Sequence, residues 1–290
     1  MNMEHMSGKY IVIVADDLGR TSSVNYAIAE AHDKGIVTAA SLMVGGKAFQ
    51  EAVQIAAMRR ELSVGLHVTL CDGRSVLPHS RIPDLTSPDG YLERRAAMAW
   101  VRYSKRSLLS QIEAEVEAQF DRLEESGIRP THVDSHHHLH MHPLIFEVLC
   151  QQASRRGVDW IRLPQESLSV VHSLRSPLRG VMPFIEWAVF GILGEYNLKI
   201  AQKYGINVAC QVYGLSRTGN VDEKYLLDIL SLARGSFNEI FTHPDVATES
   251  GRHELKALTS IKVRNLLTSR GMRLVGYREL SGRALVFNPV

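Results

Sequence analysis

The chain has 290 residues, 45% of them hydrophobic and 22% charged, which is ordinary for a globular protein with a sizeable buried core. Its formal net charge of +2 excludes the strong basic field that nucleic-acid binding depends on, so we expect no nucleic-acid partner. The three cysteines, Cys71, Cys150 and Cys210, are widely spaced without a CxxC pair. This spacing argues against a zinc ribbon or a disulfide scaffold and indicates a reducing compartment.

Met1 to Tyr10 lacks the apolar core of a signal peptide, so we expect a cytoplasmic protein. Short β-type runs then alternate with helical segments, the pattern of βα units around a parallel sheet. The clearest helix covers residues 107–125, where an apolar stripe repeats at 3.6-residue spacing. The expected strands cover residues 10–15, 38–44, 63–69, 131–135, 160–163, 207–211, 239–242 and 273–275.

Two stretches rich in proline, glycine and polar residues, 71–92 and 164–179, interrupt this rhythm and predict long loops at the mouth of an active site. The apolar run 181–193 is too short to span a bilayer. It predicts a buried or amphipathic helix, with an apolar patch for a lipid-like substrate or membrane surface as the alternative. No repeat or linker marks a boundary, so residues 1–290 are interpreted as one domain. Seven or eight strands favour a barrel, with a doubly wound sheet as the alternative.

Six of the thirteen histidines lie from His132 to His142, within and directly after the expected strand 131–135. Neutral imidazole is the commonest protein ligand for a catalytic transition metal, so the cluster predicts a metal site. An expression tag is excluded because the run is internal and interrupted, and a helix start follows at Pro143. A surface histidine patch is the simpler alternative for some of them. Alternation puts His132, Asp134 and His136 on one face of the strand.

Polar residues stand at the ends of several expected strands, and in a parallel barrel these ends converge on one face. Each has a structural alternative. Asp16 and Asp17 can cap a helix, His67 and His243 can be hydrogen-bonded core residues, and Arg162 can form a salt bridge. An aspartate with two histidines and water in the open positions is a catalytic metal set, and a second carboxylate can accept a proton. A chelate by His136 and His140 at i, i+4 is a further alternative if that segment is helical. The strand-end residues are Asp16, Asp17, His67, His136, Arg162 and His243.

Four motifs resemble those of the YdjC-like carbohydrate deacetylases, over nearly the whole chain. They are Ala15-Asp16-Asp17-Leu18-Gly19, Gly65-Leu66-His67, Thr131-His132-Val133-Asp134-Ser135-His136-His137-His138-Leu139-His140 and Thr242-His243-Pro244. Residues 38–46 and 258–260 further resemble the branch associated with hopanoid biosynthesis. The resemblance implies a single-domain distorted TIM-like (β/α) barrel and removal of acetyl from an N-acetylglucosamine carried on a hopanoid lipid.

By position, the resemblance implies that Asp17, His67 and His136 bind one divalent cation, magnesium or zinc. It implies Asp16 as the general base, with Arg162 tuning that base and His243 protonating the leaving amine. Two positions depart from the family pattern: Leu18 replaces a phenylalanine, and Asp245 follows His243-Pro244 where a small residue is usual. The second departure leaves the role of His243 open.

The resulting hypothesis is metal-assisted amide hydrolysis of an N-acetylated sugar or glycolipid. The alternatives are a chito-oligosaccharide deacetylase, another metal-dependent hydrolase such as a phosphoesterase, and a sugar-binding protein without catalysis. A phosphate substrate is disfavoured because only Arg20 and Arg162 are basic beside the expected ligands. The apolar run 181–193 favours a lipid-linked sugar, so soluble chito-oligosaccharides are expected to be poor substrates. Peripheral membrane contact and a homodimer are left open.

Overall fold

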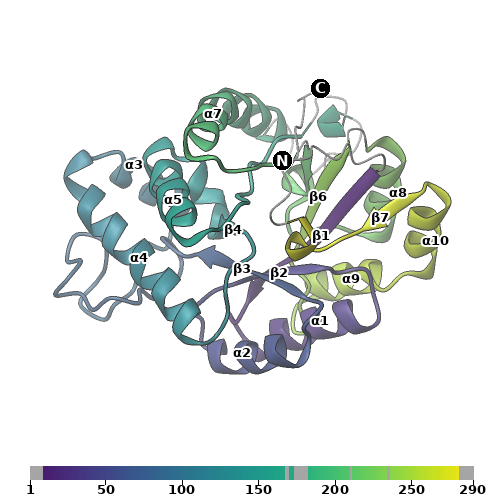
Figure 1. Ribbon diagram of the computed structural model, residues 1–290, viewed down its shortest axis with the longest axis horizontal. Coiled ribbons are helices and arrows are strands. Elements are labelled where there is room, and N and C mark those ends of the chain that lie inside the picture. Colours follow the sequence, from purple (N-terminus) through teal and green to yellow (C-terminus); the bar gives the residue numbers. More distant parts are fainter. Residues whose placement is uncertain (1–8, 167–169, 173–181, 210, 234–235, 281–290) are drawn as a thin grey trace.

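A computed structural model describes residues 9–166, 170–172, 182–209, 211–233 and 236–280 (Figure 1). Its centre is a seven-stranded sheet in which every paired strand runs parallel to its neighbour. The expected α/β class with parallel strands is confirmed. The strands are β1 (Lys9–Leu18), β2 (Ala39–Leu42), β3 (Ser63–Val68), β4 (Val133–Ser135), β5 (Gln211–Tyr213), β6 (Phe237–Thr242) and β7 (Met272–Leu274).

The sheet has the order β4-β3-β2-β1-β6-β5, with β7 beside the first residues of β1. It curls into an open half-barrel rather than a closed one, which corrects the expected barrel. On the open side, the expected strand 160–163 is reduced to two isolated bridges, in which Ile161 pairs with Val133 and Trp160 with Asn207. The expected strand 207–211 is also wrong, because β5 begins at Gln211. Neither segment offers a continuous ladder that would close the ring.

Helices cover the convex side of the sheet (Figure 1). The predicted helix 107–125 is confirmed, as a short 3₁₀ turn that continues into α4. The apolar run 181–193 is helical from residue 182 onward, as part of α7. The helices are α1 (Ser22–Asp33), α2 (Phe49–Met58), α3 (Ala96–Tyr103), η1 (Arg106–Leu108), α4 (Leu109–Glu125), η2 (His136–Met141), α5 (Pro143–Arg156), α7 (Met182–Tyr204), η4 (Leu215–Arg217), α8 (Glu223–Leu232), α9 (Glu249–Leu258), α10 (Ile261–Ser269) and α11 (Tyr277–Leu280).

Local chemistry explains where the helices nearest the strand ends begin. The hydroxyl of Thr21 accepts a hydrogen bond from the Val24 backbone and caps α1, so the acidic pair Asp16–Asp17 is not the cap. Pro143 occupies the first turn of α5, as the sequence predicts, because its missing N–H costs nothing there. Gly157 ends α5 with a left-handed φ of 70°.

Alternate residues of the strands enter two different apolar clusters, which separates the inside of the half-barrel from its helix-covered side. In β1, Ile11 and Ile13 join the large cluster that includes the helices, whereas Val12 and Val14 join a smaller one with Trp160 and Phe237. The smaller cluster therefore marks the inner face of the strands, which the buried polar side chains described below share.

The predicted loop 71–92 contains only isolated bridges, such as Arg74 with Tyr91, and is confirmed as a loop. Most of the predicted loop 164–179 lies outside the described residues, and the prediction is wrong at residues 170–172, which are helical. Cys71 and Cys150 are buried free thiols, and Cys210 also lies outside the described part. Within the described residues, no helix combines the length and apolarity needed to cross a bilayer. The single domain over residues 1–290 stays a prediction.

Candidate metal centre and active site

A β-bulge at the end of β1 orients the acidic pair. Ala15 pairs with Ala40 and Leu18 with Leu42, so β1 carries one residue more than β2 between these points. Asp16 continues the interior face of Val12 and Val14. Asp17 would face the helices in a regular strand, but its φ of 68° turns its carboxylate towards the same space. Both residues are buried: Asp16 is 1% exposed to solvent and Asp17 is 5% exposed.

Strand alternation brings further polar groups to this interior. In β3, Val64, Leu66 and Val68 face the helices, which places His67 on the inner face. In β4 the same alternation places Asp134 inside, next to His67 in the parallel register. Gly65 precedes His67 on the same inner face of β3. A larger residue does not fit at position 65, because its Cβ would lie 2.5 Å from the ring of His132.

His136, the first residue of η2, completes a group of three buried side chains. Its Nδ1 lies 3.0 Å from Asp17 Oδ1, and His67 Nε2 lies 3.4 Å from the same oxygen. One ligand atom from each of Asp17, His67 and His136 falls within 4.8 Å of the others. The three residues proposed from the sequence as metal ligands are therefore adjacent, although 119 positions separate the first from the last.

The donor atoms of this group fit a cation. Asp17 Oδ1 is buried and has no hydrogen-bond partner, while Oδ2 of the same carboxylate accepts a hydrogen bond from Arg20 at 2.8 Å. His67 donates from Nδ1 to Asp134 at 2.7 Å, which leaves Nε2 directed at Asp17. A carboxylate behind a metal-binding histidine in this way fixes the ring and its tautomer. One oxygen and two imidazole nitrogens thus remain as donors, a set that suits zinc and can also accept magnesium.

Two other groups of potential ligands overlap with this one and fit a cation less well. Asp16, His67 and Asp134 form one, but Arg162 already neutralises both carboxylates there. Asp72, His136 and His137 form the other, in which the His137 side chain is 45% exposed and Asp72 also contacts Arg20. We therefore assign Asp17, His67 and His136 as the candidate metal ligands.

Arg162 is completely buried and links the catalytic candidates. It donates to both oxygens of Asp16, at 2.7 and 2.8 Å, and its Nη1 lies 2.8 Å from Asp134. Its Nε donates to Glu239. Burial alone would lower the pKa of Arg162, but these three carboxylates hold it well above its usual value. The bidentate pairing fixes the orientation of Asp16.

His243 follows β6 and borders the same space. Its Nε2 lies 3.8 Å from Asp16 Oδ2, and its side chain is 26% exposed. The backbone N–H of His243 donates to the buried carboxylate of Glu254, which anchors the residue behind the pocket. Asp245, the departure from the family pattern, also lines this pocket and accepts a hydrogen bond from the backbone of Ala247.

The charges in this interior attract a cation. Burial alone raises the pKa of Asp17, but His136 and His67 outweigh it and hold the pKa well below its ordinary value. Burial alone lowers the pKa of His67, but Asp134 and Asp17 outweigh it and raise the pKa to about 10. The two shifts share one cause, which is the attraction between these buried carboxylates and the protonated imidazoles beside them. A divalent cation between the same side chains would take the place of that positive charge.

The other histidines of the cluster have structural partners. His140 contacts the Ser135 hydroxyl at 2.7 Å through Nδ1 and the Arg162 carbonyl at 3.0 Å through Nε2, so the alternative chelate with His136 is wrong. His132 contacts Ser41 at 3.1 Å and stacks on Tyr277. His138 packs edge-on against Phe241. These three histidines are buried, so they belong to the packed interior and do not form a surface patch.

Sequence reasoning missed two buried carboxylates that organise the site. Asp134 contacts both His67 and Arg162, and Glu239 pairs with Arg162 and accepts a hydrogen bond from Tyr277. The signal for Asp134 was present, because alternation put it on the same face as His136. Glu239 is interior by the same argument, two positions before Phe241.

A pocket of about 620 Å³ opens over these residues and is lined by Asp16, Asp17, His67, His136 and His243 together with Phe190 of α7. Arg20 and Thr21 separate it from a second pocket of about 560 Å³. Residues with strained backbone conformations cluster around these two pockets. Among the described residues, the non-glycine residues with positive φ all line one of these two pockets, and strain of this kind is typical of functional sites. They are Asp17, Asp72, His137 and His138.

The fold and the site define an open α/β half-barrel with a buried His/Asp cluster at the carboxyl ends of its strands. The sequence profile described as YdjC-like protein matches residues 10–269, and the chain therefore belongs to the YdjC-like family. A carbohydrate deacetylase of Geobacillus stearothermophilus is 31% identical over 282 residues, which cover 93% of this chain and 98% of that protein. A chitooligosaccharide deacetylase of Salmonella typhimurium is 34% identical over 178 residues, 61% of this chain and 68% of that protein.

A crystal structure from Enterococcus faecalis, for which cellobiose-phosphate cleavage has been suggested, superposes with a TM-score of 0.74. The two chains are 24% identical, and the match covers 95% of this chain and all of the other. At this identity the similarity establishes the fold alone. The deacetylase relatives support sugar deacetylation, whereas the hopanoid branch rests on the sequence resemblance.

Proposed function

We propose that the protein hydrolyses the N-acetyl group of an N-acetylglucosamine-type sugar, with one divalent cation held by Asp17, His67 and His136. The observation that carries this proposal is the approach of those three buried side chains, with Asp17 Oδ1 3.0 Å from His136 Nδ1 and 3.4 Å from His67 Nε2. The names of the relatives supply the substrate class. A bound divalent ion would polarise the acetyl carbonyl and lower the pKa of a water beside it.

The residues around the cation would carry the proton transfers. Water adds to the acetyl carbon, the bond from that carbon to nitrogen breaks, and acetate and a free amine result. Asp16, held by Arg162, accepts the proton that the water loses. His243, 3.8 Å from Asp16, donates a proton to the departing nitrogen. Phe190 and the residues beyond Pro244 form the pocket wall on which the sugar ring rests.

The test of this proposal is acetate release from an N-acetylglucosamine conjugate by the wild-type protein and by Asp16→Asn. Loss of the general base should reduce turnover by about two to four orders of magnitude while the bound ion is retained. Asn at position 16 keeps the shape of the side chain, and Glu30→Gln on α1, where the carboxylate pairs with Lys34, is a control for the loss of one carboxylate. An Asp16→Asn variant that keeps most of its activity contradicts this role.

The finer identity of the substrate rests on the resemblance to the hopanoid-associated branch and on α7, which brings an apolar ring into the pocket wall. We infer that the N-acetylated sugar is carried on a hopanoid lipid. In this proposal the lipid leaves the pocket along the apolar side of α7. A cytoplasmic location stays a prediction, and the homodimer is untested.

The second candidate is deacetylation of soluble chito-oligosaccharides, which the Salmonella relative and the adjoining second pocket favour. That pocket, lined by Arg74, Tyr91 and Arg94 of the loop after β3, has room for a further sugar. Comparing acetate release from diacetylchitobiose and from a lipid-linked N-acetylglucosamine separates the two. Efficient turnover of diacetylchitobiose would reverse our preference.

A further inference from the structure

The helix α7 exposes a line of large apolar side chains. Ile185 is 50% exposed, Val189 45%, Ile192 75% and Tyr196 56%. These four residues, the α7 stripe, are spaced by four, three and four positions. At 3.6 residues per turn they fall within an arc of about 60° and extend over about 16 Å of helix. A continuous apolar patch of this kind marks an interaction surface, whereas single exposed apolar residues do not.

The polarity of the stripe changes along the helix axis. Its first members are aliphatic, Tyr196 follows, and Lys199 and Lys203 continue the same line on the next two turns. Lys199 has no ion-pair partner among the described residues, and Lys203 pairs with Glu147 at 2.9 Å. Glu195 lies about 100° from Tyr196, at the edge of this face. An apolar line that ends in basic side chains suits a helix lying in the plane of an anionic bilayer, with the apolar residues below the headgroups and the lysine ammonium groups among them.

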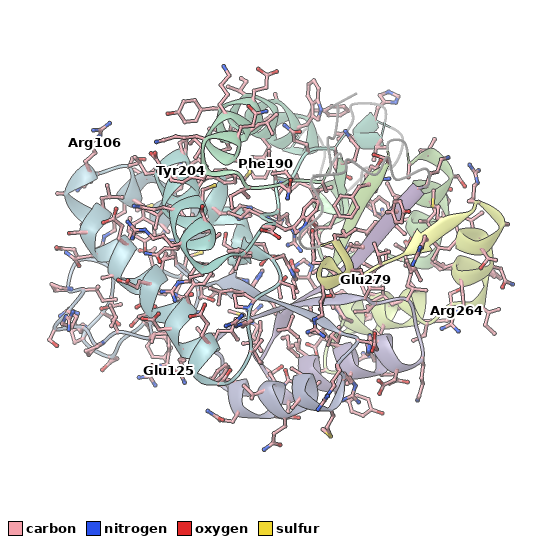
Figure 2. The ribbon with its side chains drawn as sticks, viewed as in Figure 1. Arg106, Glu125, Phe190, Tyr204, Arg264 and Glu279 are labelled. Carbon is pink, nitrogen blue, oxygen red and sulfur yellow. The ribbon has the colours of Figure 1, made fainter. Side chains whose placement is uncertain are left out.

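The same helix borders the active-site pocket. Phe190, labelled in Figure 2, lines that pocket and contacts the ring of His138 edge-on, while its neighbour Val189 belongs to the stripe. Tyr204, also labelled, marks the basic end of the helix. A surface that covers the stripe would therefore lie beside the mouth of the pocket.

We propose that the α7 stripe docks on an anionic lipid bilayer, with the aliphatic residues among the acyl chains and Lys199 at the headgroups. This orientation would present the pocket mouth to a lipid-linked sugar, a consequence that rests on the proposed function. Docking itself depends only on the stripe.

A second copy of the chain fits the stripe less well than a bilayer. Two-fold pairing with antiparallel helices would set the lysine end of one stripe against the isoleucine end of the other. Two-fold pairing with parallel helices would bring the two copies of Lys199 side by side, with like charges opposed. An anionic bilayer offers acyl chains to the aliphatic end of the stripe and negative headgroups to its lysine end.

Sedimentation of the full-length protein with vesicles tests the proposal, using phosphatidylcholine alone and phosphatidylcholine mixed with phosphatidylglycerol. The wild-type protein should bind the mixed vesicles more strongly than the neutral ones. Ile192→Glu should reduce binding to both at least about tenfold, because it places a charge among the acyl chains. Lys199→Glu should weaken binding to the mixed vesicles and leave binding to neutral ones unchanged.

Ile261→Glu is the matched control, since Ile261 is also 75% exposed but lies on α10, apart from α7 (Figure 1). This variant should bind vesicles as the wild type does. Wild-type protein that stays unbound with both kinds of vesicle overturns the proposal, as does Ile192→Glu that binds like the wild type. A wild-type dimer that Ile192→Glu converts to a monomer overturns it in favour of a second copy.

Acetate release without vesicles keeps this test separate from that of the proposed function. With a water-soluble N-acetylglucosaminide, wild type, Ile192→Glu and Ile261→Glu should be equally active. If all three lack activity both on this substrate and on a detergent-dispersed lipid-linked N-acetylglucosamine, but only Ile192→Glu loses vesicle binding, deacetylation is refuted and docking stands. If all three are active and none binds vesicles, docking is refuted and deacetylation stands.

Discussion

Acid should destabilise the fold through histidines that are buried in neutral form. Burial lowers the pKa of His132 and of His140 to about 3, and neither ring is accessible to solvent. Between pH 6.5 and pH 3 the unfolded chain binds a proton at each position and the folded protein does not. The free energy of unfolding therefore falls as the pH falls, by about 1.4 kcal/mol per pH unit for each histidine. From pH 6.5 to pH 4.5 each contributes a loss of about 2.3 kcal/mol, because the unfolded histidine is only half protonated at pH 6.5.

Other buried groups also change how steeply the free energy of unfolding falls with pH. They do not change the contribution that each of these two histidines makes. His67, with its pKa raised to about 10, is protonated in both states below pH 6.5 and adds no slope in this window. The lowered pKa of Asp17 matters only below the pKa of the unfolded chain, about 3.9. Burial raises the pKa of Glu166 and of Glu254, which adds stability as the pH falls and offsets part of the loss. A comparison of variants isolates the histidine contribution.

The assay is urea unfolding of wild type and of His132→Asn from pH 7 to pH 4.5, each with chelator present. The variant should be less stable at pH 7, because it loses the contact with Ser41 and the stacking on Tyr277. Its stability should nevertheless fall with a slope smaller by about 1.4 kcal/mol per pH unit. Equal slopes for the two proteins would refute the claim that His132 is buried in neutral form.

Three further substitutions test the packing of the site. Asp134→Asn should weaken divalent-ion affinity by about ten- to a hundredfold, because His67 loses the carboxylate that orients it; unchanged affinity in a calorimetric titration would contradict this. Arg162→Met should lower the free energy of unfolding by about 3–5 kcal/mol at pH 7 by leaving buried carboxylates unpaired, and chemical unfolding measures it. Gly65→Ala should cost about 1–3 kcal/mol, since the new Cβ meets the His132 ring; a wild-type melting temperature would count against that close contact.

The strands that could be read from the sequence are those whose pattern is local. The apolar runs near residues 10–15 and 63–69 lie in β1 and β3 because strands buried on both faces need nearly continuous apolar residues. Barrel closure was not predictable in this way. It depends on whether residues 160–163 find a continuous partner, and pairing between distant segments leaves no periodic signal.

The candidate site was predictable in composition but not in connectivity. Parallel strands bring their carboxyl ends together, so Asp16, His67 and Arg162 could be expected at one place. The bulge that turns Asp17 inward could not be read, since a positive φ at an aspartate has no local sequence signature. The role of Asp134 also escaped, because its two contacts connect β4 with β3 and with residue 162, and each connection is tertiary.

The most direct test of the account is to measure bound divalent ion and acetate release together in wild type, Asp17→Asn and chelator-treated wild type. We expect about one ion per chain in the active wild type, since the three donors form a single site. Asp17→Asn should lose both the ion and the activity, and the chelated protein should recover both when zinc or magnesium is returned. Acetate release at an undiminished rate from protein without a bound divalent ion would contradict the account.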